Sequence, residues 1–330
     1  MYLKFIVKEI SDPVPLKNYL KTHQHFSSRL IKRLRLYGQV EVNGESWRMI
    51  DLVKLGDQIE IKDANELEDS CLKLKKSAYE YLVFENDYYL LVNKPAGLLS
   101  HPNYLGGTNS LEQLLSDQPL HLVSRLDRGT SGLLLISRHA HAHQRLQNTE
   151  MKKYYLLWVF GRLPETTLRL EAKIARRPGS IIEREVNEDS GKLAISHFRE
   201  LFYSPSLDIS LLSCRIETGR THQIRVHALH LGLPLIGETL YGLERLQELN
   251  PTMYQNCLKK QGLGMRQALN DKYPQQVLHA YHLAFHDPFS GKAEKFFAQE
   301  PSYFFDMLSM DEKSAASAAL RVFSEQLLQD

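Results

Sequence analysis

Residues 123–135, VSRLDRGTSGLLL, contain a single carboxylate in a short polar loop between two apolar runs. Apolar runs bounded by glycines are typical of buried strands, so we expect a strand on each side of the loop. Asp127 lies between Arg125 and Arg128, and nearby positive charge favours the ionised form of a carboxylate. An ionised carboxylate suits a nucleophile rather than a general acid. The alternative is a structural salt bridge in a tight turn, which is the commoner role of an isolated Asp-Arg turn.

The Arg-Leu-Asp of residues 125–127 and the Thr-Ser-Gly-Leu of residues 130–133 closely resemble the signature loop of the RluA-type pseudouridine synthases. This resemblance implies that Asp127 is the catalytic nucleophile. It also implies that Arg125 contacts RNA and fills the space left by a flipped uridine, a role suited to a guanidinium because its plane stacks on bases. Ser124 stands where many members have His, a departure that bears on the RNA target more than on the chemistry.

A second motif of the family follows in a run of bulky residues, 153–161, that predicts a strand. The family has a Tyr six residues before a Gly, which selects Tyr155 ahead of Gly161. Side chains alternate along a strand, so Tyr154 should point to the opposite face and pack in the core. The resemblance implies that Tyr155 packs on the target uracil and helps to remove the proton from C5.

A third motif lies in residues 217–242, where a Gly-Arg-Thr-His turn opens a predicted helix with an apolar stripe. Arg225 lies beside this stripe in a half-buried position, where a charge needs a partner. In the family the basic residue of this motif pairs with the catalytic Asp. The resemblance therefore makes Arg225 the partner of Asp127.

The N-terminal segment is basic, because residues 13–38 include Lys and Arg but no Asp or Glu. Apolar spacing predicts a helix from about Ser27 or Ser28 to Gly38, and an Asn-Gly pair at residues 43–44 predicts a β-hairpin. Together with Gly56 and Asp57 further along the chain, this pattern resembles the αL RNA-binding module named after ribosomal protein S-four. A solvated amphipathic helix on a capping subdomain is the alternative. The residues predicted to bind RNA here are Arg29, Lys32 and Arg33.

Three segments follow from these patterns: an RNA-binding module at residues 1–62, a polar linker at 63–79 and a catalytic domain at 80–330. Periodicity alone supports an α+β protein with many strands. The resemblance implies a mixed, mainly antiparallel central sheet with flanking helices, beside the small αL-type module. Residues 244–275 should form a helical insertion of unknown role, and residues 314–328 a further helix.

The composition excludes several classes of protein. Lys and Arg total 41 against 39 Asp and Glu, so the net charge of +2 does not by itself indicate a nucleic-acid partner. Three widely spaced cysteines fit neither a disulfide framework nor a zinc site and suggest a reducing compartment. The first residues lack a signal peptide, and no apolar run reaches membrane-spanning length. We expect a cytoplasmic monomer without a membrane partner.

The reaction implied by the resemblance detaches uracil from C1′ of its ribose and rejoins it through C5. It needs no cofactor, and the sequence contains neither a phosphate-binding Gly-rich loop nor a dinucleotide fingerprint. His139 and His143 are four residues apart but have no acidic or cysteine companion, so we expect no metal site. The expected substrate is structured RNA, with large-subunit ribosomal RNA first and transfer RNA second. The target uridine must leave its stack to react.

Two other functions remain open. The chain could be a non-catalytic RNA-binding or ribosome-assembly protein, although its Asp127, Tyr155 and Arg225 argue against a lost activity. A hydrolase that uses Ser131 with His222 is the other, but the chain has no Gly-x-Ser-x-Gly elbow. Outside these sets, His101 could be a general base, and a structural role is favoured for it.

Overall fold

The computed structural model describes residues 2–26, 28–63, 74–101, 110–116 and 120–329. The first part of the chain forms a small four-stranded antiparallel sheet in the order β1-β6-β3-β4. Helices α1 and α2 pack on this sheet, and a short pair, β2 and β5, lies beside them. The bounds are β1 Tyr2–Ile6, β2 Val14–Pro15, α1 Leu16–Thr22, α2 Ser28–Tyr37, β3 Gly38–Val42, β4 Glu45–Ser46, β5 Leu52–Val53 and β6 Gln58–Asp63.

The predicted basic helix and hairpin are both present in this N-terminal module. Helix α2 begins at Ser28 and ends before Gly38, where the chain enters β3. Asn43 and Gly44 both have positive φ, 54° and 85°, as the two-residue turn of a β-hairpin requires. Apolar residues between these helices and the sheet form a core of the module's own.

The rest of the chain forms a large sheet of eleven strands in the order β13-β12-β14-β15-β11-β16-β10-β8-β7, with β17 on β16 and β9 on β10. Strands β10 and β16 pair in parallel, whereas the other neighbours in this sheet are antiparallel. The predicted mixed, mainly antiparallel sheet is thus confirmed. Its strands are β7 Leu82–Glu85, β8 Tyr89–Lys94, β9 His121–Leu122, β10 Ser131–Ser137, β11 Met151–Phe160, β12 Thr167–Arg176, β13 Arg184–Val186, β14 Lys192–Ser204, β15 Ile209–Ile216, β16 Leu278–His286 and β17 Ala293–Phe297.

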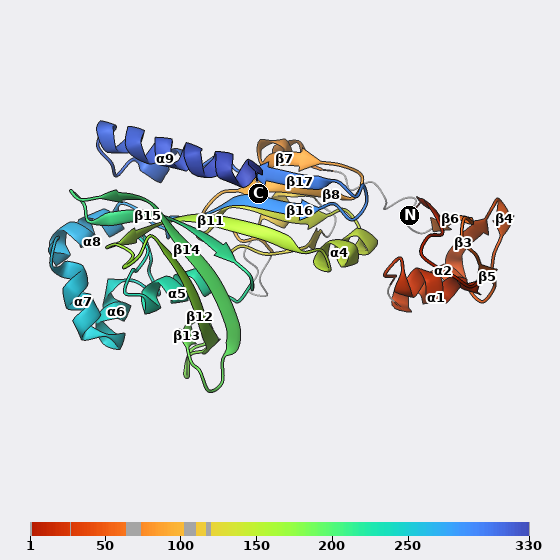
Figure 1. The fold of residues 1–330 in the computed structure, drawn as a ribbon, viewed down its shortest axis with the longest axis horizontal. Helices are drawn as coiled ribbons and strands as arrows, with labels where there is room; N and C mark the ends of the chain where they lie inside the picture. Colours follow the sequence, from red (N-terminus) through yellow and green to blue (C-terminus); the bar gives the residue numbers. More distant parts are fainter. Residues whose placement is uncertain (1, 27, 64–73, 102–109, 117–119, 330) are drawn as a thin grey trace.

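Helices cover both faces of this sheet (Figure 1). Long helix α9 lies along one face, and α5 lies across the other, with α6, α7 and α8 at the end of the sheet. Alternation along β11 supplies both layers, because Trp158 packs with residues of α9 and Val159 with residues of α5. The helix bounds are η1 Lys76–Glu80, α3 Leu111–Leu115, α4 Ala140–Gln147, α5 Gln223–His230, α6 Leu243–Leu249, α7 Pro251–Leu258, α8 Leu263–Asp271, η2 Ser302–Phe305 and α9 Met310–Gln329.

Several element boundaries differ from the predicted ones. The C-terminal helix starts four residues early because Ser309 and Glu312 form a capping box, each side chain bonding the other's backbone N–H. Strand β13 begins only at Arg184, because the Ser180 hydroxyl accepts the N–H groups of residues 182 and 183 and the chain turns there. The predicted insertion is helical, as α6 to α8. Most of the predicted linker, residues 64–73, lies outside the described residues.

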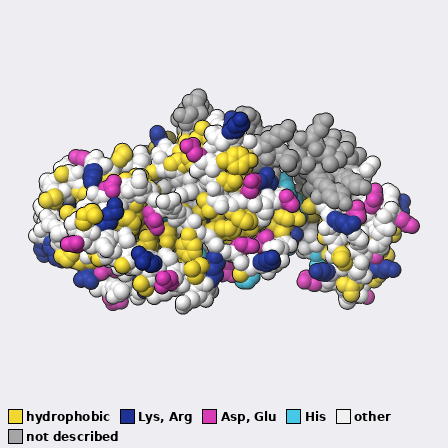
Figure 2. Space-filling view, turned by 90° about the horizontal axis from the view of Figure 1, so that it is seen from above, with side chains coloured by type: hydrophobic (Ala, Val, Ile, Leu, Met, Phe, Trp, Pro, Cys, Tyr) yellow, Lys and Arg dark blue, Asp and Glu magenta, His cyan; other side chains and the backbone are white. Residues whose placement is uncertain are grey.

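The N-terminal module lies at one end of the molecule, beside α4 (Figure 1). Phe26 of the module packs against His141 of α4 with ring centroids 4.5 Å apart. Over the face seen in Figure 2, basic and acidic side chains are interspersed, in keeping with the near-neutral net charge. None of the helices described is long and apolar enough to cross a membrane.

Candidate active site

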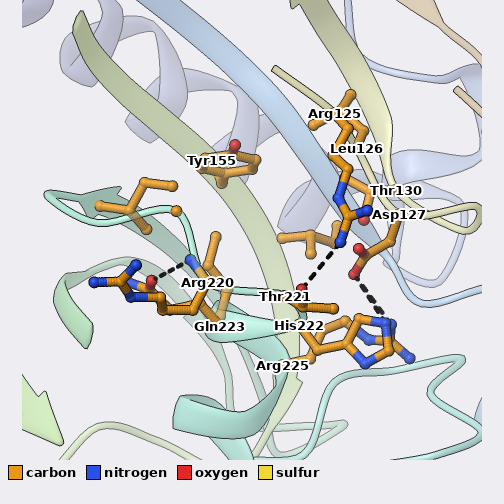
Figure 3. A pocket seen from close by; sticks show the side chains of 14 residues that line it. Arg125, Leu126, Asp127, Thr130, Tyr155, Arg220, Thr221, His222, Gln223 and Arg225 are labelled. Atoms are coloured by element: carbon orange, nitrogen blue, oxygen red, sulfur yellow. Dashed lines mark hydrogen bonds and ion pairs between the residues drawn. The ribbon is translucent and has the colours of Figure 1, made fainter. Parts of the chain in front are cut away.

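A small pocket lies where the loop before β10, strand β11 and the turn before α5 meet (Figure 3). Its volume is about 120 Å³. This volume is close to that of a protein cavity of about 150 Å³ that holds benzene, so the open pocket is on the scale of one six-membered ring, with the remainder of a ligand outside. The polar residues that line it are Arg125, Asp127, Thr130, Tyr155, Arg220, Thr221, His222, Gln223 and Arg225.

Arg225 joins two carboxylates at the base of this pocket. Its Nη1 donates to Oδ2 of Asp127 at 3.1 Å, while Nε and Nη2 donate to the two carboxylate oxygens of Glu238 at 2.6 and 2.7 Å. The Glu238 side chain is fully buried and that of Arg225 is 5% exposed, whereas the Asp127 side chain is 24% exposed. The guanidinium is therefore held from below by Glu238 and presents its remaining edge to Asp127.

Electrostatics keep this guanidinium charged. Burial alone would lower the pKa of Arg225, but the hydrogen bonds and charge of Glu238, followed by the charge of Asp127, raise it above its ordinary value. A permanent cation beside Asp127 holds the carboxylate by a charge-assisted hydrogen bond and fixes its direction.

Glu238 was not predicted from the sequence. It lies 13 residues after Arg225, beyond the end of α5, and within the third motif at residues 217–242, where sequence reasoning gave it no role. Arg225 itself indicated that a second acceptor was needed. A buried guanidinium carries five N–H donors, and one partly exposed carboxylate cannot satisfy them.

Tyr155 lines the same pocket, and Tyr154 does not. Tyr154 packs on the other face of the sheet, edge-on to His282 and Phe323. The pairing of β11 with β16 shifts register between the two tyrosines, a β-bulge of the kind often found beside active sites. Burial first, and then the charge of Asp127, raise the pKa of the Tyr155 hydroxyl, so it is a neutral phenol at pH 7.

The two arginines that flank Asp127 in sequence do not pair with it in the structure. Arg125 reaches across the pocket mouth and its Nη2 donates to the Thr221 hydroxyl at 3.0 Å, as Figure 3 shows. Arg128 turns away and donates to the carbonyl of Gly97 at 3.0 Å. The cation that does bond Asp127 is therefore Arg225, from a distant part of the sequence, and not one of these two neighbours.

The loop is fixed from beneath by Lys94 and by close packing. Lys94 is fully buried and its Nζ donates to the carbonyls of residues 95, 98 and 128. Burial lowers its pKa to about 7, against an opposing effect of Asp127. Gly132 has φ +109° and a Cβ there would meet the Ala280 carbonyl oxygen at 2.2 Å, so only glycine fits where β10 pairs with β16.

His222 is a second residue of the site that sequence reasoning did not place beside Asp127. Its Nε2 lies 3.8 Å from Oδ2 of Asp127, and its backbone is left-handed at φ 59°. From the sequence alone, His222 was considered only with Ser131, in the hydrolase alternative, which was disfavoured. Ser131 is buried and hydrogen-bonds to His279 at 2.9 Å, so the geometry gives the hydrolase alternative no nucleophile.

The remaining candidates lie away from the pocket. Lys32 is exposed on α2 of the N-terminal module, and Arg29 and Arg33 lie on the same helix, their side chains outside the described part. His139 caps α4 through Ala142 N–H, and no cluster of three potential metal ligands occurs within the described ranges. His101 pairs with Glu112 at the start of α3, a structural contact.

The sequence comparisons now identify the family. The family model of the RNA pseudouridylate synthases matches residues 88–230, which include the loop of Asp127, both tyrosines and α5. The chain is 32% identical to the "uncharacterized RNA pseudouridine synthase YjbO" of Bacillus subtilis, over 83% of this chain and 92% of that protein. This chain belongs to the RluA-type RNA pseudouridine synthases. As a family member it is an enzyme, an isomerase of RNA.

A second relative agrees with this assignment, and two solved structures share the fold. The chain is 32% identical to the "ribosomal large subunit pseudouridine synthase D" of Neisseria meningitidis, over 83% of this chain and 72% of that protein. The human RNA pseudouridylate synthase domain containing 4 has the same fold, with a TM-score of 0.52 at 19% identity, over 74% of this chain and 95% of that one. For the human domain containing 1 the TM-score is 0.51, also at 19% identity, over 72% of this chain and 94% of that one.

Proposed function

We propose that this pseudouridine synthase modifies specific uridines in large-subunit ribosomal RNA, with Asp127 as its nucleophile. The observation that carries the proposal is the Asp127–Arg225–Glu238 chain in a pocket that fits one ring. The Asp127 carboxylate and the Tyr155 ring both line the pocket into which the uracil would enter.

The chemistry follows from these positions. Asp127 attacks the ribose C1′ or the uracil ring, the glycosidic bond breaks, and the uracil turns and rejoins through C5. Arg225 holds the carboxylate ionised and directed at the ring. Tyr155 packs on the uracil, and its hydroxyl assists removal of the proton from C5. The proton lost from C5 and the one gained at N1 balance, so no external reactant is consumed.

RNA recognition requires that the target uridine leave its stack, at a cost of a few kcal/mol. Arg125, exposed at the pocket mouth and bonded to Thr221, is our candidate to fill the vacated space. We also propose that residues 1–62 act as an RNA-binding module joined by residues 63–79 to a catalytic domain at 80–330. In that module Arg29, Lys32 and Arg33 on α2 contact phosphates.

Large-subunit ribosomal RNA is the favoured substrate because relatives over most of this chain carry that name, among them synthase D of Neisseria meningitidis. Transfer RNA is the runner-up, and a non-catalytic role in RNA binding or ribosome assembly is the remaining alternative.

The test compares ribosomal and transfer RNA from wild-type cells, cells that lack the protein and cells that carry Asp127→Asn, using carbodiimide mapping of pseudouridine. We expect one or a few large-subunit uridines to lose the modification in both altered strains. Loss confined to transfer RNA would replace the substrate. Loss in the deletion but retention in Asp127→Asn would refute the nucleophile, and no change in any RNA would favour the non-catalytic role.

A further inference from the structure

His222 is held against the nucleophile by an arrangement that the mechanism above does not use. Its side chain is 12% exposed and lines the pocket, with Nε2 3.8 Å from Oδ2 of Asp127. On the other side of the ring, Nδ1 lies 2.7 Å from the hydroxyl of Tyr241, a residue 1% exposed. The backbone at His222 has φ 59° and ψ 18°, the left-handed region that non-glycine residues rarely adopt.

Hydrogen-bond accounting determines which ring nitrogen carries the proton. The Tyr241 oxygen accepts the backbone N–H of Arg184 at 2.8 Å. Its own hydrogen is buried, and buried hydroxyls are almost always fully paired. The acceptor for that hydrogen among the described residues is Nδ1 of His222, since a donating Nδ1 would leave it unpaired. The neutral imidazole therefore carries its proton on Nε2, on the side of Asp127.

The charge around the ring favours this neutral form. Burial lowers the pKa of His222, an effect that the negative charge of Asp127 opposes. The cation of Arg225 lowers the pKa further, Glu238 raises it, and the more distant Arg184 lowers it. At pH 7 the ring is thus a donor at one nitrogen and an acceptor at the other.

We propose that His222 is a positioning residue for the nucleophile: its Nε2–H, aimed by Tyr241, becomes the second hydrogen-bond donor to Asp127 when RNA fills the pocket. The distance of 3.8 Å is too long for a hydrogen bond in the free protein. Catalytic hydrogen bonds are often long without substrate and shorten in the complex. Arg225 and His222 both approach Oδ2 of Asp127, so two donors on that one oxygen fix the carboxylate and leave Oδ1 free to face the reacting ring. This inference rests on the proposed role of Asp127.

The left-handed backbone at His222 limits which residues can replace it without strain. Asn and Gly both tolerate that conformation, so His222→Asn and His222→Gly remove the Nε2–H without added backbone strain. His222→Gln instead places an amide N–H at the distance of Nε2. Tyr241→Phe keeps the ring beneath the Arg225 guanidinium but removes the hydroxyl that directs the imidazole. His230→Asn, at the exposed end of α5, is the control.

The first measurement is the tautomer of His222 in the full-length free protein, by ¹⁵N NMR of labelled histidines with His222→Asn for assignment. We expect a protonated Nε2 and an unprotonated Nδ1, and a loss of this preference in Tyr241→Phe. A proton on Nδ1, or an imidazolium at pH 7, would overturn the inference whatever the activity.

The second measurement is tritium release from large-subunit ribosomal RNA and from transfer RNA transcribed with [5-³H]UTP, since bonding at C5 expels that hydrogen. We expect kcat of His222→Gly to fall on the order of 100-fold, as for a misplaced reacting group. KM should stay near wild type, His222→Gln should recover part of kcat, and His230→Asn should match wild type. Wild-type kcat in His222→Gly with an inactive Asp127→Asn overturns this inference alone. An active Asp127→Asn overturns the proposed nucleophile as well.

Discussion

Replacing Arg225 by Met removes the cation that links Asp127 to Glu238, and its effects on stability and on activity should separate. The Glu238 side chain is fully buried, and besides Arg225 it accepts N–H groups of residues 240 and 241. Without the guanidinium, its negative charge stays in the protein interior with no opposite charge. Leaving one member of a buried ion pair unpaired costs about 3–5 kcal/mol. We expect Arg225→Met to lower the free energy of unfolding by that amount.

Removing the second charge should restore most of the loss. In Arg225→Met/Glu238→Gln neither charge of this pair remains, and the Gln oxygen still accepts the N–H groups of residues 240 and 241. Buried ion pairs replaced by neutral groups of similar volume are often neutral in stability. We therefore expect the double variant to regain more than half of the stability lost in the single one. Its activity should stay as low, because Asp127 still lacks its partner.

The assay is urea unfolding followed by tryptophan fluorescence. The chain has two tryptophans, and a Trp47→Phe background leaves Trp158, fully buried in the core of the large sheet, as the probe. Tritium release from uridine-labelled RNA measures activity in the same variants. A double variant that is no more stable than Arg225→Met would refute the reasoning about the buried charge. Recovery of activity along with stability would refute the role of Arg225 in holding Asp127.

Three further predictions follow from the fold. Gly132→Ala, whose Cβ would meet the backbone of β16 at 2.2 Å, should lower the free energy of unfolding by more than Gly179→Ala, which has φ +77° and open space around it. The control should lose about 1–2 kcal/mol in urea unfolding, from its left-handed backbone alone, and equal losses would contradict the packing argument. Stability should be retained above about pH 6.5 and fall as the pH is lowered toward 4, since burial lowers the pKa of several histidines to about 4 and the unfolded chain then binds more protons. Each such histidine contributes up to about 1.4 kcal/mol per pH unit, and a flat urea midpoint between pH 7 and 5 would refute this. These histidines are His227, His279 and His282. Lys32→Ala should weaken RNA binding and reduce the salt slope of log K by about 0.9 for a lost phosphate contact, whereas Lys260→Ala, exposed in the insertion, should leave the slope unchanged in filter binding.

Local patterns predicted most of the elements that form the site. The strand on each side of the Asp127 loop, the strand of Tyr155 and the helix of Arg225 all follow from short-range periodicity and turn residues. Alternation also assigned Tyr154 and Tyr155 to opposite faces, as the structure has them. Local patterns did not predict the hydrogen-bond partners of Arg125 and Arg128, because residues adjacent in sequence need not be adjacent in space.

The order of the elements, the family and the loop that contains Asp127 could all be predicted from the sequence, since they depend on residues within a few positions of one another. The groups that surround the Asp127 carboxylate could not, because they come together only in the folded chain. Arg225 reaches Asp127 across 98 residues, and Tyr241 bonds His222 across 19. Such contacts depend on how α5 packs against the sheet and how the following turn folds back under it. The packing of segments that are far apart in sequence sets these distances, so local periodicity cannot predict them.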